Sequence, residues 1–172
     1  ATLANKGLEV IEAHWLFGMP YDKIEVLVHP QSVVHSLVEY ADGSTLAQLS
    51  PPDMRIPIQY ALLHPPRLAA PVSGLDWPSL RTLTFEEPDR ESFPLLDLAY
   101  RAGRAGGGAP AVYSAANEEA VRLFLESRLG FNGIADAVAD ALDEFSPAAP
   151  GGIESILEIE RRVRAFVRRR ST

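Results

Sequence analysis

The chain has 172 residues, 47% of them hydrophobic and 23% charged, which suits one ordinary globular domain with or without a small second one and excludes a large multidomain enzyme. The net charge of -7 argues against a protein that wraps nucleic acid, because neutralising phosphates requires excess lysine and arginine. The chain has no cysteine, which excludes disulfides and thiolate metal sites and fits a reducing cytoplasm. No apolar run approaches the ~20 residues that cross a membrane.

The first predicted element is a helix over residues 3–17. Leu8, Ile11 and Trp15 recur at the spacing of one helical face, which predicts that this face is buried and that the opposite face is polar. Gly18, with a proline two residues later, is the signal that ends the helix.

Three strands are expected after this helix. Residues 24–29 and 33–40 are rich in β-branched side chains, which favour strands. Asp42-Gly43 separates the second stretch from residues 45–49, as the tight turn of a β-hairpin would. A further short strand is expected over residues 81–85.

The rest of the chain predicts helices separated by breaks. Asp53 stands near the cap position of a short helix, and the prolines of residues 64–79 predict an irregular connector. Ser114 is a plausible helix cap, and the glycines at 106–108 are expected to be a linker. The helices of the bundle are expected over residues 93–102, 114–128, 134–145 and 153–170. The fold class is therefore α+β, with helix and a short sheet followed by an all-helical bundle.

The most informative polar residues lie at the start of the first helix. Asn5 and Glu9 are four residues apart and Lys6 and Glu9 are three apart, so an amide, an ammonium and a carboxylate share one face. Gly7 between them costs about 1 kcal/mol relative to alanine in a helix interior, and close approach of a ligand or another backbone is the usual compensation. Two interpretations remain open, a functional site and a solvated face with an ordinary ion pair.

Other polar residues favour structural interpretations. His29 and His35 would be ~20 Å apart along a strand at ~3.3 Å per residue, so a shared metal ion is not expected unless Pro30 turns the chain. The acid pair Glu118-Glu119 is interpreted as helix-end or solvated charge. The arginines of residues 161–170 are expected to complement the dipole of the last helix and to leave nucleic acid unbound.

The literal sequence resembles the 1-deoxy-D-xylulose 5-phosphate reductoisomerase family. Two long motifs carry the resemblance, NKGLEVIEAHWLF at 5–17 and HPQSVVHS at 29–36. Shorter matches follow at DGS (42–44), LAQL (46–49), PDMRIPI (52–58), LTF (83–85), PD (88–89), FP (93–94) and AANE (115–118). The resemblance therefore covers essentially the whole chain.

The resemblance implies an oxidoreductase and isomerase of the non-mevalonate isoprenoid pathway. The family converts 1-deoxy-D-xylulose 5-phosphate into 2-C-methyl-D-erythritol 4-phosphate with NADPH and a Mg or Mn ion. Matched residue by residue, Lys6, Glu9 and His35 are implied as catalytic, with Glu9 as a metal ligand. Asn5 and Lys6 are implied in substrate binding, and Met54 in cofactor binding.

The family also has parts that this sequence does not show, namely a dinucleotide-binding domain and an Asp-x-Glu pair of metal carboxylates. We therefore expect the chain to be the C-terminal portion of such an enzyme and to be inactive alone. Residues 1–85 would be the end of the catalytic domain with its connector, and residues 86–172 the helical C-terminal domain. We also expect a cytoplasmic homodimer formed through the sheet, with no nucleic-acid or membrane partner. The alternative is a stand-alone, non-catalytic dimerisation or interaction module.

Overall fold

The computed structural model describes residues 2–69, 72–145 and 148–170, and the chain divides into two compact units. The helical unit comprises Ala1–Val26 and Pro88–Thr172, and the mixed unit comprises Leu27–Glu87. Helices together with a two-stranded sheet confirm the α+β class. The predicted division at residues 85 and 86 concerns the domains of the whole enzyme and stays a prediction, whereas the compact units place residues 1–26 with the C-terminal helices.

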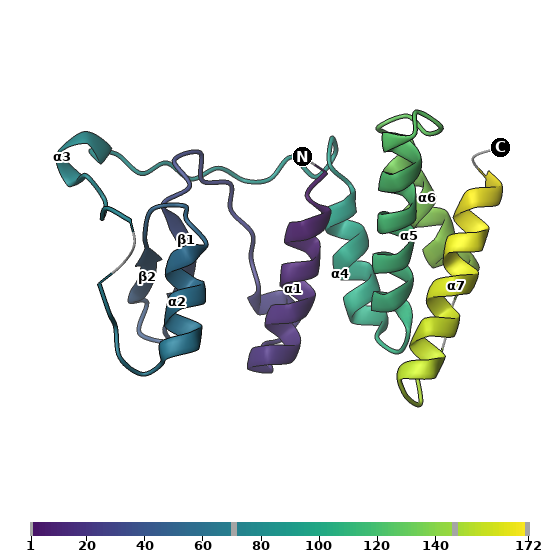
Figure 1. Ribbon diagram of the computed structural model, residues 1–172, viewed down its shortest axis with the longest axis horizontal. Coiled ribbons are helices and arrows are strands. Elements are labelled where there is room, and N and C mark those ends of the chain that lie inside the picture. Colours follow the sequence, from purple (N-terminus) through teal and green to yellow (C-terminus); the bar gives the residue numbers. More distant parts are fainter. Residues whose placement is uncertain (1, 70–71, 146–147, 171–172) are drawn as a thin grey trace. The chain divides into compact units, whose positions relative to one another are not determined.

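The helical unit is built from α1 and the four helices that follow residue 88, and Figure 1 shows α4, α5, α6 and α7 next to one another. Their bounds are α1 Ala4–Phe17, α4 Leu95–Ala105, α5 Ala109–Leu125, α6 Gly133–Glu144 and α7 Ile153–Arg170, with a short 3-10 helix at Tyr21–Lys23. In the described part of the chain, no helix has both the length and the apolarity to cross a membrane. The cytoplasmic location stays a prediction.

Helix α5 is the centre of this unit. It contacts α4, α6 and α7, and α1 packs mainly on α4, so each outer helix buries one apolar stripe while its other side faces solvent. The largest side chains with almost no exposed surface are Tyr113, Leu95, Leu96, Leu123, Ile134, Glu119, Val112, Val138, Val163 and Val167. All of them belong to α4, α5, α6 or α7, which makes the bundle the hydrophobic core of the chain.

The start of α5 differs from the sequence prediction. The helix begins at Ala109, directly after the predicted glycine linker, and Ser114 lies inside it instead of capping it. Pro110 occupies the first turn, where its missing N–H costs no hydrogen bond. Gly106 and Gly107 both have positive φ angles, and this conformation turns the chain between α4 and α5.

The mixed unit contains the predicted hairpin. β1 (Val34–Glu39) pairs with β2 (Thr45–Leu49) in antiparallel orientation, and Gly43 in the turn has a φ of +84°, which a residue without a Cβ adopts easily. The short helix α2 (Arg55–Leu63) confirms the helix predicted after Asp53, and the connector holds one further helical turn, α3 (Trp77–Leu80).

Two predicted strands are wrong. Residues 24–29 and 81–85 form no strand. A single antiparallel bridge joins Val28 to Glu86, the residue directly after the second stretch. β-branched residues favour strands only where a neighbouring strand supplies partners. Here the partner is 58 positions away and is too irregular to continue the pairing.

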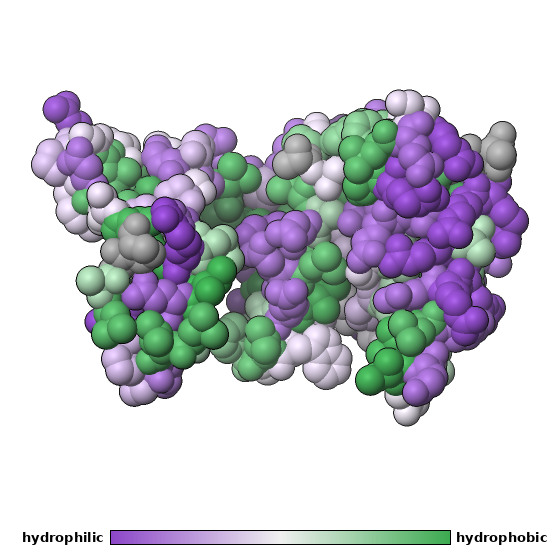
Figure 2. Space-filling view, in the orientation of Figure 1, coloured by the Kyte–Doolittle hydropathy of each residue, from purple (hydrophilic) through white to green (hydrophobic). Residues whose placement is uncertain are grey.

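The mixed unit has little core of its own. Val33 is its one buried apolar residue among those described. Several large apolar side chains of the hairpin and of α2 are exposed, namely Leu37, Val38, Tyr40, Leu46, Ile58 and Leu62. Figure 2 shows hydrophobic residues at the visible surface of this unit. Exposed apolar surface of this kind is typical of interaction sites and ligand-binding grooves.

Candidate functional site

The first two turns of α1 bring the predicted amide, ammonium and carboxylate together. Asn5 Nδ2 donates to Glu9 Oε1 over 3.0 Å, and Lys6 Nζ donates to Glu9 Oε2 over 2.5 Å. The side chains of Lys6 and Glu9 are 42% and 46% exposed, so solvent and small ligands reach them. We call Asn5, Lys6 and Glu9 the α1 cluster.

The packing of α1 explains why this cluster faces outward. The buried positions of the helix are Ala4, Gly7, Val10 and Ile11, which recur every three or four residues on one side. The predicted buried face was partly wrong, because Trp15 is 70% exposed. Gly7 sets the orientation, since a Cβ there would lie 2.4 Å from Ala99 Cβ of α4. The glycine therefore permits close approach of two helices, one of the two compensations that the sequence suggested.

Tyr113 fixes the start of α1 from inside the bundle. Its hydroxyl donates to the Leu95 carbonyl over 3.0 Å and lies 3.4 Å from the carbonyl of Ala4. Burial raises the pKa of the Tyr113 phenol, so the hydroxyl keeps its proton and serves as a donor. The first turn of α1, which carries Asn5 and Lys6, is thus held against both α4 and α5.

The α1 cluster offers a cation one carboxylate. Mg and Mn ions favour oxygen ligands and near-octahedral coordination, so Glu9 fits as one ligand and leaves most of a coordination sphere to other groups. In the part of the chain that the structure describes, no three His, Cys, Asp or Glu side chains gather into a metal site. Lys6 beside Glu9 can neutralise a phosphate or alkoxide, and the amide of Asn5 can hydrogen-bond a hydroxyl.

His35 sits in an irregularity of β1. Val34 pairs with Leu49 and Ser36 with Gln48, so His35 is an extra residue without a partner on β2. Such a bulge redirects a side chain and is common next to active sites. The His35 ring turns back to the neighbouring strand end, where Nε2 lies 3.1 Å from the Ser50 carbonyl. Because a carbonyl only accepts, Nε2 carries the proton.

Met54 is at the start of α2 and is 69% exposed. The residues on either side of it fix the helix start, because the carboxylate of Asp53 accepts from the backbone N–H of Arg55 over 2.9 Å and from its guanidinium over 2.6 Å. Hydrogen bonds from Arg55 lower the pKa of Asp53 to about 2. A flexible, exposed thioether on a fixed backbone is suited to contact a flat apolar group.

The predicted site residues thus fall into two groups. Asn5, Lys6 and Glu9 touch one another in the helical unit, whereas His35 and Met54 belong to the mixed unit. His35 contacts Ser50, the residue after β2, four positions before Met54. The roles implied for all five residues stay predictions.

A buried charge between α5 and α7 corrects one sequence interpretation. Glu118 is largely exposed, as expected, but the side chain of Glu119 is only 1% exposed. Its carboxylate accepts from Arg122 on the same helix and from Arg168 Nε of α7 over 2.8 Å. Burial alone would raise the pKa of Glu119, but hydrogen bonds from Arg168 and Arg122 outweigh it and lower the pKa to about 2. The sequence shows both charges but not their contact across 49 positions.

The arginines of α7 have structural partners. Arg164 pairs with Glu118 of α5 at 2.5 Å, and Arg170 pairs with Asp140 of α6 at 2.7 Å. Together with the Arg168 contact, these pairs fasten the last helix to the bundle. The predicted absence of nucleic-acid binding stays a prediction.

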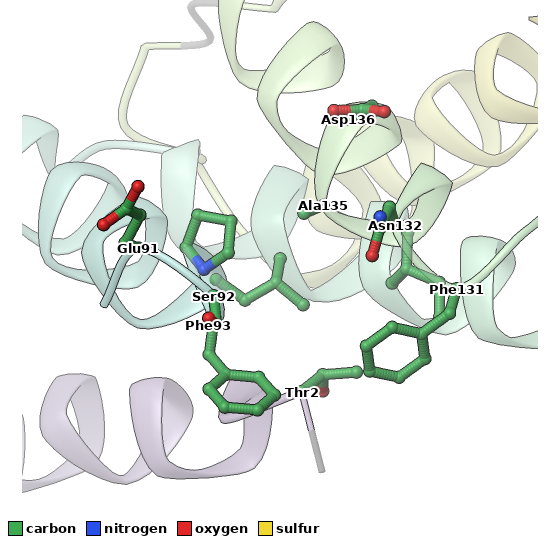
Figure 3. Close-up of a pocket in the computed structure, with 11 residues that line it drawn as sticks. Thr2, Glu91, Ser92, Phe93, Phe131, Asn132, Ala135 and Asp136 are labelled. Carbon is green, nitrogen blue, oxygen red and sulfur yellow. The ribbon is translucent and has the colours of Figure 1, made fainter. Parts of the chain in front are cut away.

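A shallow cavity of about 340 Å³ lies in the helical unit. Figure 3 shows the rings of Phe93 and Phe131 on either side of Thr2, with Asn132 and Asp136 further along the wall. None of the predicted site residues lines this cavity. Its lining combines two carboxylates with apolar rings and supplies no cation that would hold a phosphate.

Comparison with known proteins first gives the class of protein. Residues 49–166 match the family model described as the DXP reductoisomerase C-terminal domain. In solved structures, the fold matches a reductoisomerase from Zymomonas mobilis in complex with NADPH, with a TM-score of 0.95 and 48% identity over 99% of this chain and 45% of that one. A DOX-P reductoisomerase with fosmidomycin and magnesium matches with a TM-score of 0.94 and 42% identity over 99% of this chain and 45% of that one.

Curated relatives agree with this class. The 1-deoxy-D-xylulose 5-phosphate reductoisomerase of Chloroherpeton thalassium is 52% identical over 97% of this chain and 43% of its own length. That of Aromatoleum aromaticum is 56% identical over 98% of this chain and 42% of its own length. The chain therefore belongs to the 1-deoxy-D-xylulose 5-phosphate reductoisomerase family, as the sequence motifs indicated, and it spans less than half the length of these relatives.

Proposed function

We propose that this chain supplies part of the active site of an NADPH-dependent reductoisomerase that converts 1-deoxy-D-xylulose 5-phosphate into 2-C-methyl-D-erythritol 4-phosphate in the non-mevalonate pathway. The observation that carries the proposal is the α1 cluster, whose carboxylate, ammonium and amide converge at an exposed helix start. Structurally similar relatives hold NADPH, fosmidomycin and magnesium, which supports the same ligands here.

Each residue of the cluster has a chemical task in this proposal. A bound Mg or Mn ion supplies Lewis acidity toward the oxygens of the ketol substrate. Glu9 provides one charged oxygen ligand for that ion, Lys6 stabilises anionic phosphate or alkoxide oxygens, and Asn5 orients a hydroxyl. His35 offers the substrate its Nδ1, which accepts a hydrogen bond while Nε2 donates to Ser50, and Met54 contacts the nicotinamide cofactor.

We expect the 172-residue chain alone to be inactive. Glu9 is a single carboxylate, and one such ligand holds a hard, strongly hydrated cation only weakly. Two effects each lower the activation barrier of the reaction by roughly several kcal/mol. One is the proximity of the hydride donor to the substrate, and the other is polarisation of the substrate by the metal ion. Without them, the residual rate should fall below detection.

The test compares this chain with a full-length protein that contains it. NADPH consumption is followed with 1-deoxy-D-xylulose 5-phosphate and magnesium in each sample. We expect turnover by the full-length protein and none by the 172-residue chain. A full-length protein that binds NADPH but leaves this substrate unchanged would contradict the proposed reaction, and turnover by the short chain would contradict its expected inactivity.

We further propose that the chain forms a homodimer through the hairpin. β1 and β2 form a two-stranded sheet, and within the described residues neither strand pairs with a third. Unpaired edges bind other strands readily. Val38 and Leu46 are cross-strand partners on one face of the sheet, and both are exposed, as is Tyr40. A two-fold axis would let two copies cover this face with the same residues.

Sedimentation velocity measures this directly. At a protein concentration of tens of micromolar, we expect the wild-type chain to sediment with twice its mass of 18.8 kDa. Leu46→Lys should make the protein monomeric, because it places a charge in the interface. Leu125→Lys, at an exposed position on α5 of the helical unit, serves as the control. A wild-type chain that sediments only as an 18.8 kDa species would refute the dimer and, with it, the alternative of a dimerisation module.

A further inference from the structure

The HPQS motif at residues 29–32 forms a set of contacts that the proposed function does not use. Beside it, Val28 and Glu86 exchange two backbone hydrogen bonds, of 2.8 and 2.9 Å. His29 Nδ1 lies 2.7 Å from the Thr84 carbonyl, and because a carbonyl only accepts, Nδ1 carries the proton. The His29 ring also stacks on Phe85, with centroids 4.8 Å apart.

Gln31 engages the same threonine with both ends of its amide. Its Nε2 donates to Thr84 Oγ1 over 2.9 Å, and its Oε1 accepts from the Thr84 backbone N–H over 3.2 Å and lies 3.1 Å from Oγ1. Contacts that close a loop of more than 50 residues constrain the chain far more than contacts between sequence neighbours. We call His29, Gln31 and Thr84 the clamp.

The clamp continues into the start of β1. Ser32 turns the chain with a φ of +52°, and its N–H donates to the His29 carbonyl over 2.9 Å. The next residue, Val33, is buried, and its carbonyl accepts from the Ser50 N–H over 3.0 Å. The carbonyl of Ser50 in turn receives His35 Nε2. The N–H of Ser50 is therefore bound by Val33, and the carbonyl of Ser50 is bound by the His35 ring.

We propose that His29, Gln31 and Thr84 are positioning residues that fix the start of β1 and thereby set the orientation and tautomer of His35. The clamp acts on His35 through Val33 and Ser50. His35 occupies a bulge, so the hydrogen bonds between β1 and β2 constrain it less than its neighbours. Contacts that hold the start of β1 therefore contribute to its position. The catalytic meaning of this positioning rests on the proposed function, but the positioning itself does not.

The experiment measures nitrogen shifts of the His35 ring and hydrogen exchange of the Ser50 amide by NMR on the 172-residue chain. Thr84→Val keeps the shape of the side chain and removes its hydroxyl, and Thr84→Ser restores the hydroxyl. Thr82→Val is the matched control in the same segment. In the wild type and in Thr84→Ser, we expect the Nε2–H tautomer of His35 and a protected Ser50 amide. In Thr84→Val, we expect a mixture of tautomers and exchange at least ~10-fold faster.

Two results would overturn the proposal. The first is a Thr84→Val chain whose His35 tautomer and Ser50 exchange match those of the wild type. The second is a wild-type chain in which the Ser50 amide exchanges without protection. An equal change in Thr82→Val would also count against the clamp, since it would show a general weakening of the segment. Because none of these measurements uses turnover, they remain informative even if the proposed reaction is refuted.

Discussion

Replacing Gly7 by alanine tests whether close approach of α1 and α4 holds the α1 cluster in place. The new Cβ would lie 2.4 Å from Ala99 Cβ and 3.1 Å from the Tyr113 hydroxyl, whereas carbon atoms in contact need about 3.5–4.0 Å. Both carbons are attached directly to helix backbones, so no rotamer change relieves the overlap. The helices must instead separate by roughly 1 Å at this point.

The magnitude follows from two opposing effects. Overpacking of this kind costs about 1–3 kcal/mol, and alanine returns up to ~1 kcal/mol of helix propensity relative to glycine. Because the overlap involves fixed backbone carbons, we expect the upper part of the range and a net loss of ~1–2 kcal/mol in the free energy of unfolding. The first turn of α1 should also lose the Tyr113 contact and become more mobile.

Urea unfolding followed by circular dichroism measures this change. Gly130→Ala is the control, since no atom lies within 4 Å of the Cβ position there. Combining Gly7→Ala with Ala99→Gly removes the overlapping carbon, so the double variant should be more stable than the sum of the single effects by at least ~1 kcal/mol. A Gly7→Ala protein more stable than wild type, or strictly additive effects, would refute the close-packing explanation.

Three further predictions concern the charges of the bundle. Glu119→Gln should lower the free energy of unfolding by about 1–3 kcal/mol, because it removes a buried charged acceptor, whereas Glu118→Gln should cost less than ~1 kcal/mol; urea unfolding compares the two. The pKa of Glu119 falls from 4.5 to about 2 on folding, so the ionised carboxylate stabilises the folded protein. This contribution should be complete above pH 4.5 and should be lost as the pH falls toward 2, and thermal melts at a series of pH values measure it. Duplex DNA should not bind, and salt-sensitive binding that vanishes with Arg168, Arg169 and Arg170 replaced by alanine would contradict this.

The sequence predicted the α1 cluster because its geometry is local. Helical spacing places Asn5 and Lys6 within reach of Glu9 wherever the helix lies, and the structure shows both hydrogen bonds. The burial of α1 depends instead on a distant partner. Gly7 against Ala99 turned the helix so that Trp15 became exposed, and no periodicity within residues 3–17 contains that information.

The same distinction explains the other differences. A bridge between Val28 and Glu86 and an ion pair between Glu119 and Arg168 both join residues far apart in the sequence. Strand propensity and charge are properties of one residue or its neighbours, so they predicted a strand and a solvated carboxylate. The bulge at His35 likewise depends on the register of two strands, which the turn sequence specifies only in part.

The central claim is that Glu9 supplies a metal ligand to a reductoisomerase active site, and Glu9→Gln tests it most directly. In a full-length protein that contains this chain, kcat/KM is measured with 1-deoxy-D-xylulose 5-phosphate and NADPH over a range of magnesium concentrations. Glu12→Gln, an exposed carboxylate on the same helix, is the control. We predict that Glu9→Gln lowers kcat/KM at least ~100-fold, about 2.7 kcal/mol of transition-state stabilisation, while Glu12→Gln leaves it unchanged. Near wild-type activity of Glu9→Gln at low magnesium would contradict the claim and leave the α1 cluster as a solvated ion pair.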